Sequence, residues 1–173
     1  MLTVKEMQAL SRKLPLDKFC QQLGPFALIQ RPLGEVAGLD DLDLPMRAAR
    51  TRIAELEAVK SGAMELIRDF AALSVATLPP MSGNDELLVG RLPNCDLVVD
   101  HPSVSKRHAV LRWDATKKQC SVKDLGSTNG TRIDSDMAVR GETPLRDGDV
   151  VTFGEAHFWY LLTATLHAKL SQT

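Results

Sequence analysis

Hydrophobic residues in the first half of the chain recur every three or four positions, which is the spacing of an amphipathic helix. The pattern predicts a first helix that ends near Lys13, and Thr3 and Glu6 have the spacing of a capping box at its start. A second short helix is expected over 16–23, where a proline precedes the run and Gly24 follows it. The N-terminal region is therefore expected to be helical.

Two further apolar segments of this region leave alternatives open. The run 26–30 is too short for its period to separate helix from strand. A longer amphipathic helix is expected from Pro45, with apolar residues at Met46, Ala49, Ile53, Leu56, Ala63, Ile67 and Phe70. This helix either packs on its own chain or forms a short coiled-coil seam that joins two copies into a homodimer. Lys60 on the stripe weakens the second alternative.

From residue 87 onward the pattern changes to short apolar runs with turn residues between them. The runs are 87–89, 97–99, 109–113, 120–122, 150–153 and 157–162. This regular spacing predicts a mainly β fold, an antiparallel β-sandwich over 83–164. The chain is then divided into a helical region over 1–82, the sandwich, and a short C-terminal tail over 165–173.

The composition is that of an ordinary globular protein, with 44% hydrophobic residues and a formal net charge of −1. Near-neutral charge argues against nucleic-acid binding, because proteins with that function usually carry a basic surplus. No apolar run is long enough to span a bilayer, so no membrane association is expected. Cys20, Cys95 and Cys120 are isolated thiols, which suits the reducing cytoplasm and argues against disulfides or a zinc site. No metal or other cofactor is expected.

Polar loop residues of the predicted sandwich combine the groups that bind a phosphate dianion. Arg91 offers a forked guanidinium for bidentate contacts with phosphate oxygens, and Lys106 or Arg107 adds a second positive charge. Ser105 and Thr128 supply hydroxyl donors, and Asn129 can both donate to and accept from a peptide main chain. Because the loops of a sandwich gather at its two ends, residues distant in sequence can meet there.

Four successive motifs resemble those of a forkhead-associated (FHA) domain. They are Leu88-Val89-Gly90-Arg91, Pro102-Ser103-Val104-Ser105-Lys106-Arg107-His108, Asp124-Leu125-Gly126-Ser127-Thr128-Asn129-Gly130-Thr131 and Asp147-Gly148-Asp149. Their order makes the resemblance specific, and it covers residues 83–164. It implies a sandwich of about eleven strands that binds phosphothreonine peptides through loops at one end.

The resemblance also implies a role for each matching residue. Those expected to bind the phosphopeptide are Arg91, Ser105, Lys106, Thr128 and Asn129. Among them, Asn129 would bond the peptide main chain and the others would contact or surround the phosphate. Arg107 is a further candidate for contact with the ligand. The residues expected to shape the loops are Gly90, His108 and Gly130.

The function expected from these residues is binding without catalysis. The domain would recognise phosphothreonine on a partner protein in kinase-dependent signalling or assembly, and the partner would be a Ser/Thr kinase or its substrate. One alternative is a protein-interaction scaffold that uses the same fold without phosphate. Another is an autoinhibited site that holds a threonine of the chain itself, with the candidates Thr3, Thr51 and Thr77.

The residue types of a hydrolase triad are present, but their arrangement argues against catalysis. Ser105 and His108 lie on one short segment, and Asp124 would have to complete the triad. No GxSxG nucleophile elbow occurs in the chain. The sequence therefore predicts that the protein is not an enzyme.

Overall fold

The structure is a computed structural model, and it describes residues 2–31, 74–77, 85–134 and 137–171. The helix expected from Pro45 to Phe70 lies outside the described residues, and with it the predicted coiled-coil seam.

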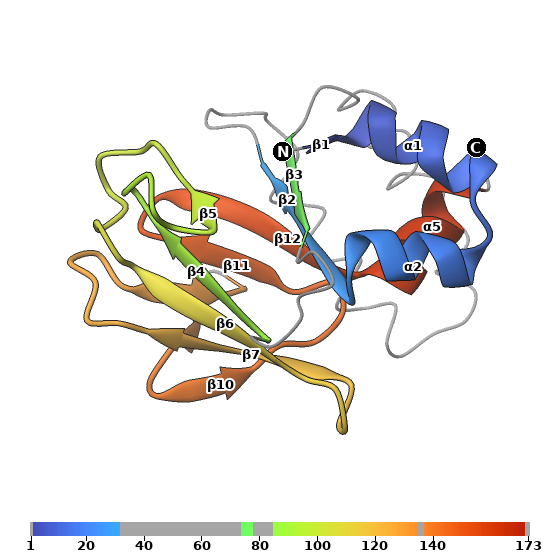
Figure 1. Cartoon of the computed structure of the whole chain (residues 1–173). Coiled ribbons are helices and arrows are strands. Elements are labelled where there is room, and N and C mark those ends of the chain that lie inside the picture. Colours follow the sequence, from blue (N-terminus) through green and yellow to red (C-terminus); the bar gives the residue numbers. More distant parts are fainter. Residues whose placement is uncertain (1, 32–73, 78–84, 135–136, 172–173) are drawn as a thin grey trace, which may run out of the picture.

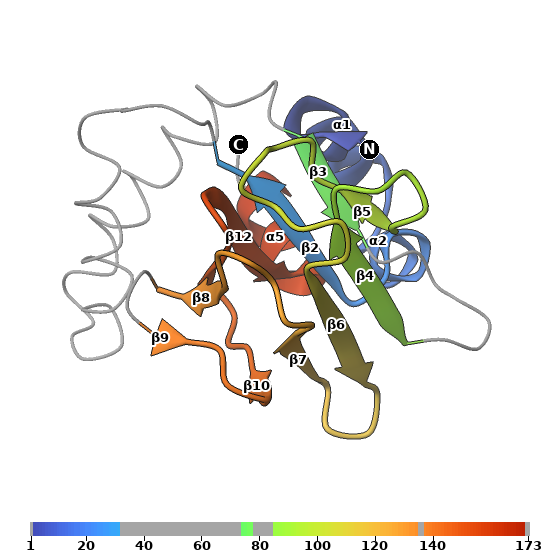
Figure 2. The ribbon, with the colours of Figure 1, turned by 90° about the vertical axis from the view of Figure 1, so that its left-hand side faces the viewer.

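The described strands form two sheets (Figures 1 and 2). The larger sheet contains, in spatial order, β1 (Leu2–Thr3), β3 (Ser74–Thr77), β2 (Phe26–Gln30), β12 (Ala156–Leu162), β11 (Val150–Phe153), β8 (Thr131–Ile133) and β9 (Met137–Ala138). The smaller sheet contains β10 (Glu142–Pro144), β7 (Gln119–Asp124), β6 (Ala109–Asp114), β4 (Glu86–Gly90) and β5 (Leu97–Val98). Neighbouring strands are antiparallel, except that β4 and β5 run parallel.

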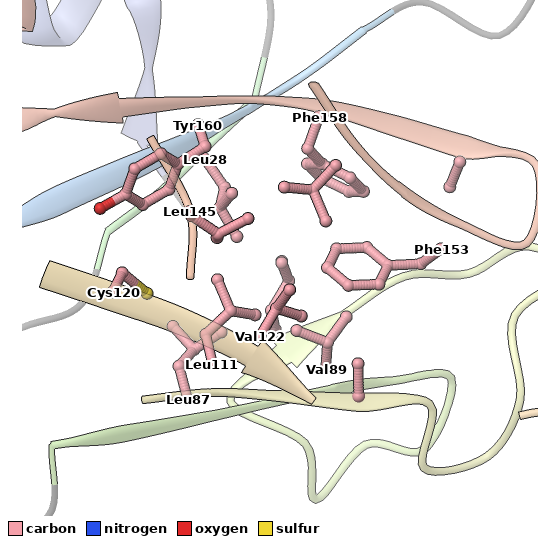
Figure 3. Packing of buried hydrophobic residues seen from close by; sticks show 14 of the residues in the cluster. Leu28, Leu87, Val89, Leu111, Cys120, Val122, Leu145, Phe153, Phe158 and Tyr160 are labelled. Atoms are coloured by element: carbon pink, nitrogen blue, oxygen red, sulfur yellow. The ribbon is translucent and has the colours of Figure 1, made fainter. Parts of the chain in front are cut away.

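The main core fills the space between the two sheets (Figure 3). The smaller sheet contributes residues such as Leu87 and Val89 of β4, which are buried, whereas Glu86 at the start of that strand is exposed. Phe153 and Phe158 meet these residues from the larger sheet, with their rings 5.7 Å apart. The expectation of a mainly β sandwich preceded by helices is confirmed.

Three helices of the described ranges cover the outer face of the larger sheet (Figure 1). They are α1 (Val4–Lys13), α2 (Leu16–Leu23) and α5 (Thr163–Ser171). The predicted capping box is present, because the Thr3 hydroxyl accepts from the Glu6 N–H while the Glu6 carboxylate accepts from the Thr3 N–H. A second cluster of buried side chains joins these helices to the sheet, and its largest members include Met7, Phe19 and Leu166.

The helices expected at the N-terminus are present, and the described part of residues 1–82 also contains strands. The run 26–30 is β2, which pairs with β12, and residues 74–77 form β3, which pairs with β2. The larger sheet therefore draws strands from both sides of the predicted limit between residues 82 and 83. Beyond residue 164 the chain continues the short helix α5, which packs with α1 and α2. Within the described ranges, no helix is long and apolar enough to cross a membrane.

Candidate functional site

Three loops at one end of the sandwich carry the predicted binding residues (the left-hand end in Figure 1). They follow β4, precede β6 and connect β7 with β8. The main chain joins the first two, because the Arg91 N–H donates to the Ser105 carbonyl at 3.0 Å. The third loop is held to the second by the Thr128 N–H, which donates to the Ser105 hydroxyl at 3.0 Å. The structure thus brings Arg91, Ser105 and Thr128 to one end of the molecule.

Ser105 lies at the centre of this arrangement and uses all its polar groups. Its N–H donates to Nδ1 of His108 at 3.0 Å, and its carbonyl accepts from Arg91. Its hydroxyl accepts from the Thr128 N–H, and it lies 3.4 Å from Thr128 Oγ1, to which it donates. The last bond is at the long end for two hydroxyls. A better acceptor that approached from solvent could therefore replace Thr128 Oγ1 as the acceptor of the hydrogen bond from the Ser105 hydroxyl.

Asn129 projects from the same loop as Thr128 and is exposed. Its amide Nδ2 donates to the Ser103 carbonyl at 2.7 Å. Within the part of the chain that the structure describes, no hydrogen bond engages its Oδ1. The amide is therefore oriented by the protein and retains an acceptor for a ligand.

Positive charge gathers around these loops. Arg91, Lys106 and Arg107 are all exposed, and none of them has a salt bridge to a carboxylate of the described residues. Arg112 on the smaller sheet shows the opposite situation, since it contacts Glu86 at 2.6 Å and Glu142 at 3.3 Å. The loop cations are thus available to an anionic ligand.

His108 is fully buried beneath the loops. Because its Nδ1 accepts from the Ser105 N–H, the proton sits on Nε2, which donates to the Gly130 carbonyl at 3.0 Å. Gly130 has a φ of 79°, a left-handed conformation in which a side chain would be strained. These contacts support the predicted structural roles of His108 and Gly130.

Asp124 organises the third loop, a role that the sequence analysis missed. Its Oδ1 accepts from the backbone N–H groups of Gly126 and Ser127, and its Oδ2 accepts from the hydroxyls of Ser127 and Thr131. Burial acts to raise the pKa of Asp124, but these hydrogen bonds together outweigh it and lower the pKa. The signal in the sequence is an Asp two residues before a Gly, the pattern of an Asx turn.

The geometry does not build the hydrolase triad. Nδ1 of His108 faces the main-chain N–H of Ser105, and the 3.9 Å between Nε2 and the Asp124 carboxylate exceeds a hydrogen bond. Among the residues that the structure describes, no base therefore contacts the Ser105 hydroxyl.

Stability should fall as the pH drops below about 6.5, the ordinary pKa of histidine. Burial lowers the pKa of His108, and the bond to Gly130 and the charge of Asp124 only partly oppose this. Below this pH the His108 side chain binds a proton in the unfolded chain but stays neutral in the folded chain. The contribution of His108 to the free energy of unfolding is therefore complete above this pH and declines below it. The loss should reach up to about 1.4 kcal/mol per pH unit.

Urea unfolding of the wild type and of His108→Gln between pH 5 and 8 measures this loss. The other histidines titrate in both proteins, so the difference in unfolding free energy isolates His108. That difference should shrink as the pH falls. A difference that is constant across the range would show that His108 does not sit in the fold as the neutral form.

Part of this chain is similar in sequence to proteins of a known family. Residues 87–154 match the family model of the FHA domain. FHA domain-containing protein PS1 of Arabidopsis thaliana is 35% identical over 69 residues, which are 39% of this chain and 5% of that protein. Mediator of DNA damage checkpoint protein 1 of Rattus norvegicus is 37% identical over 71 residues, 39% of this chain and 6% of that protein.

One solved structure, from work on phosphothreonine-dependent FHA domain interactions, has 28% sequence identity and a TM-score of 0.44, covering 51% of this chain and 83% of its own. The family match includes the Gly90-Arg91 turn, the Ser105–His108 segment and the Thr128–Gly130 turn. Residues 87–154 of this chain are an FHA domain.

Proposed function

We propose that this FHA domain binds phosphothreonine on a partner protein through Arg91, Ser105, Lys106, Thr128 and Asn129. The observation that carries the proposal is the meeting of the Ser105 and Thr128 hydroxyls beside exposed cations that no described carboxylate neutralises.

A phosphate dianion would complete the hydrogen bonding of these loops. It would accept from the Ser105 hydroxyl, whose present bond to Thr128 Oγ1 is long, and from the hydroxyl of Thr128 itself. Arg91 would supply two parallel N–H groups, and Lys106 a further charge. Each charge-assisted hydrogen bond contributes roughly 1.5–3 kcal/mol, so two or three suffice to make binding depend on the phosphate. Arg107 is exposed beside Lys106 and is a further candidate for this contact.

Asn129 would hold the peptide that carries the phosphothreonine. Its amide is already oriented by the Ser103 carbonyl, so less rotational freedom is lost when a peptide binds. The Oδ1 acceptor would then receive a main-chain N–H of the ligand. This second anchor distinguishes a phosphopeptide from free phosphate.

The biological role that follows is recruitment without catalysis. A Ser/Thr kinase would phosphorylate the threonine, and that kinase or its substrate would be the partner. The isolated cysteines suit the cytoplasm as the compartment of this encounter.

A phosphothreonine peptide selected from an oriented library should bind at least 100-fold more tightly than its unphosphorylated form, by about 3 kcal/mol. Ser105→Ala should weaken the phosphorylated peptide by about tenfold, because one charge-assisted bond is lost. Isothermal titration calorimetry measures both effects.

Ser121→Ala is the matched control. The Ser121 hydroxyl donates to Glu142 on the smaller sheet, and its loss should leave the affinity unchanged. Equal affinity for the two peptides would instead support the scaffold that works without phosphate. Unchanged binding by Ser105→Ala, with unchanged melting, would refute the assignment of Ser105.

A further inference from the structure

Ser103 precedes the phosphate-binding segment by two residues and joins three parts of the binding end. Its carbonyl accepts from the Asn129 amide at 2.7 Å, which links it to the β7–β8 loop. Its hydroxyl accepts from the Glu155 N–H at 2.8 Å, which links it to the β11–β12 turn. The function proposed above uses only the carbonyl of this residue and assigns nothing to its hydroxyl.

The β11–β12 turn is shaped to receive Ser103. Gly154 in this turn has a φ of 63°, and a Cβ at Gly154 would collide with the carbonyl and the hydroxyl of Ser103. The chain must therefore present main chain, without a side chain, at this point of contact. The close fit explains how the Glu155 N–H reaches the Ser103 hydroxyl.

His101 makes further hydrogen bonds with Ser103. Its Nδ1 lies 2.6 Å from the Ser103 hydroxyl and 3.2 Å from the Ser103 N–H. Since the N–H can only donate, Nδ1 is an acceptor, and the Ser103 hydroxyl donates to it while accepting from Glu155. The Nε2 of His101 then carries the proton and faces the Glu155 carboxylate at 4.0 Å. Every polar atom of Ser103 is thus engaged: N–H, hydroxyl and carbonyl.

We infer that Ser103 is a positioning residue for the peptide-binding amide of Asn129, an inference that rests on the proposed phosphopeptide binding. The two bonds of its hydroxyl fix Ser103 between His101 and the β11–β12 turn. The fixed carbonyl in turn sets the orientation of the Asn129 side chain. Ser103→Ala retains the carbonyl but removes the two hydrogen bonds that hold it in position. The Asn129 side chain must then lose rotational freedom when the ligand binds. Ser103 therefore acts on the ligand through Asn129 and not through the phosphate.

The test is a double-mutant cycle, with the library-selected phosphothreonine peptide as the probe. Ser103→Ala should weaken binding about fivefold, the effect of losing a neutral hydrogen bond. In an Asn129→Ala background the same change should cost less than twofold, because its target is gone. In a Ser105→Ala background it should again cost about fivefold, since Ser105 acts on the phosphate. Ser121→Ala is the matched serine control and should change nothing.

A second measurement reads the positioning without any ligand. The side-chain amide signals of Asn129 in nuclear magnetic resonance spectra should move towards those of a solvent-exposed asparagine in Ser103→Ala, and should stay in place in Ser121→Ala. A merely structural role would lower the melting temperature but would cost affinity equally in all backgrounds.

The outcomes separate the inference from the proposed function. A wild type that binds phosphorylated and unphosphorylated peptides equally refutes the proposed function, and the inference falls with it. Phosphate-dependent binding in the wild type, together with equal losses in the Asn129→Ala and Ser105→Ala backgrounds, overturns the inference alone. Asn129 signals that do not move in Ser103→Ala overturn it too.

Discussion

Arg91→Ala should weaken the binding of a phosphothreonine peptide by roughly 30- to 150-fold, or about 2–3 kcal/mol. This is the largest loss of affinity that we expect from one substitution. The Arg91 guanidinium can offer two parallel charge-assisted hydrogen bonds, and it does so from a loop that the main chain fixes to Ser105. Unfolding should be almost unaffected, because the side chain is exposed and has no salt bridge among the described residues.

Two companion variants sharpen this experiment. Arg91→Lys keeps the charge but loses the fork, so its affinity should lie between those of the wild type and Arg91→Ala. Arg112→Ala is the matched control, because Arg112 is already engaged by Glu86 and Glu142 on the outer face of the smaller sheet. Its affinity should equal that of the wild type.

Titrations at two salt concentrations provide an independent check. Salt should weaken the wild type more than Arg91→Ala, because screening acts on the charge that the variant lacks. If Arg91→Ala bound and melted like the wild type, Arg91 would be an ordinary surface residue, and the phosphate would have to be held elsewhere.

The sequence was enough to predict the elements that depend on contacts between residues close together in the chain. The Thr3–Glu6 capping box is closed by atoms three residues apart, so sequence spacing alone specifies it. The strands of the sandwich were predicted from short apolar runs with turn residues between them, as in β4. The resemblance to the FHA domain was predicted from the order of the motifs, and the family match confirms it. Geometry then brought Ser105 and Thr128 within hydrogen-bonding distance.

Features that depend on distant partners escaped prediction. In β2, Leu28 faces the sandwich core while Ala27 and Ile29 face the helices. A strand that is buried on both faces loses the alternation that would identify it, and its partner β12 lies about 130 residues away in sequence. Ser103 was equally hidden, because its role arises from contact with Glu155, which is 52 positions away.

Gly90→Val should destabilise the protein by about 3 kcal/mol, which is the upper part of the usual range for overpacking. A Cβ at position 90 would collide with the Lys106 carbonyl and lie close to the Cys95 thiol and to Cα of Arg107. Two of these three neighbours are main chain, so a change of rotamer cannot relieve the contact. The conformation of Gly90 is not among the left-handed ones, and close approach is therefore the reason for glycine here.

Since the Cβ atom itself makes the collision, Gly90→Ala should already show most of the loss. Thermal unfolding followed by circular dichroism should place both variants well below the wild type. A loss of about 3 kcal/mol corresponds to roughly 6–12 °C in a chain of this size.

Gly141→Ala separates crowding from backbone strain. Gly141 has a φ of 75°, but a Cβ there would meet nothing within 4 Å. Its substitution should cost only the strain of the left-handed conformation, about 1 kcal/mol. Melting of Gly90→Ala at or above the temperature of Gly141→Ala would contradict the crowding argument. In the two Gly90 variants, the displaced Lys106 carbonyl should also move the neighbouring Ser105. Both Gly90 variants should therefore bind the phosphopeptide more weakly, even at temperatures where they remain folded.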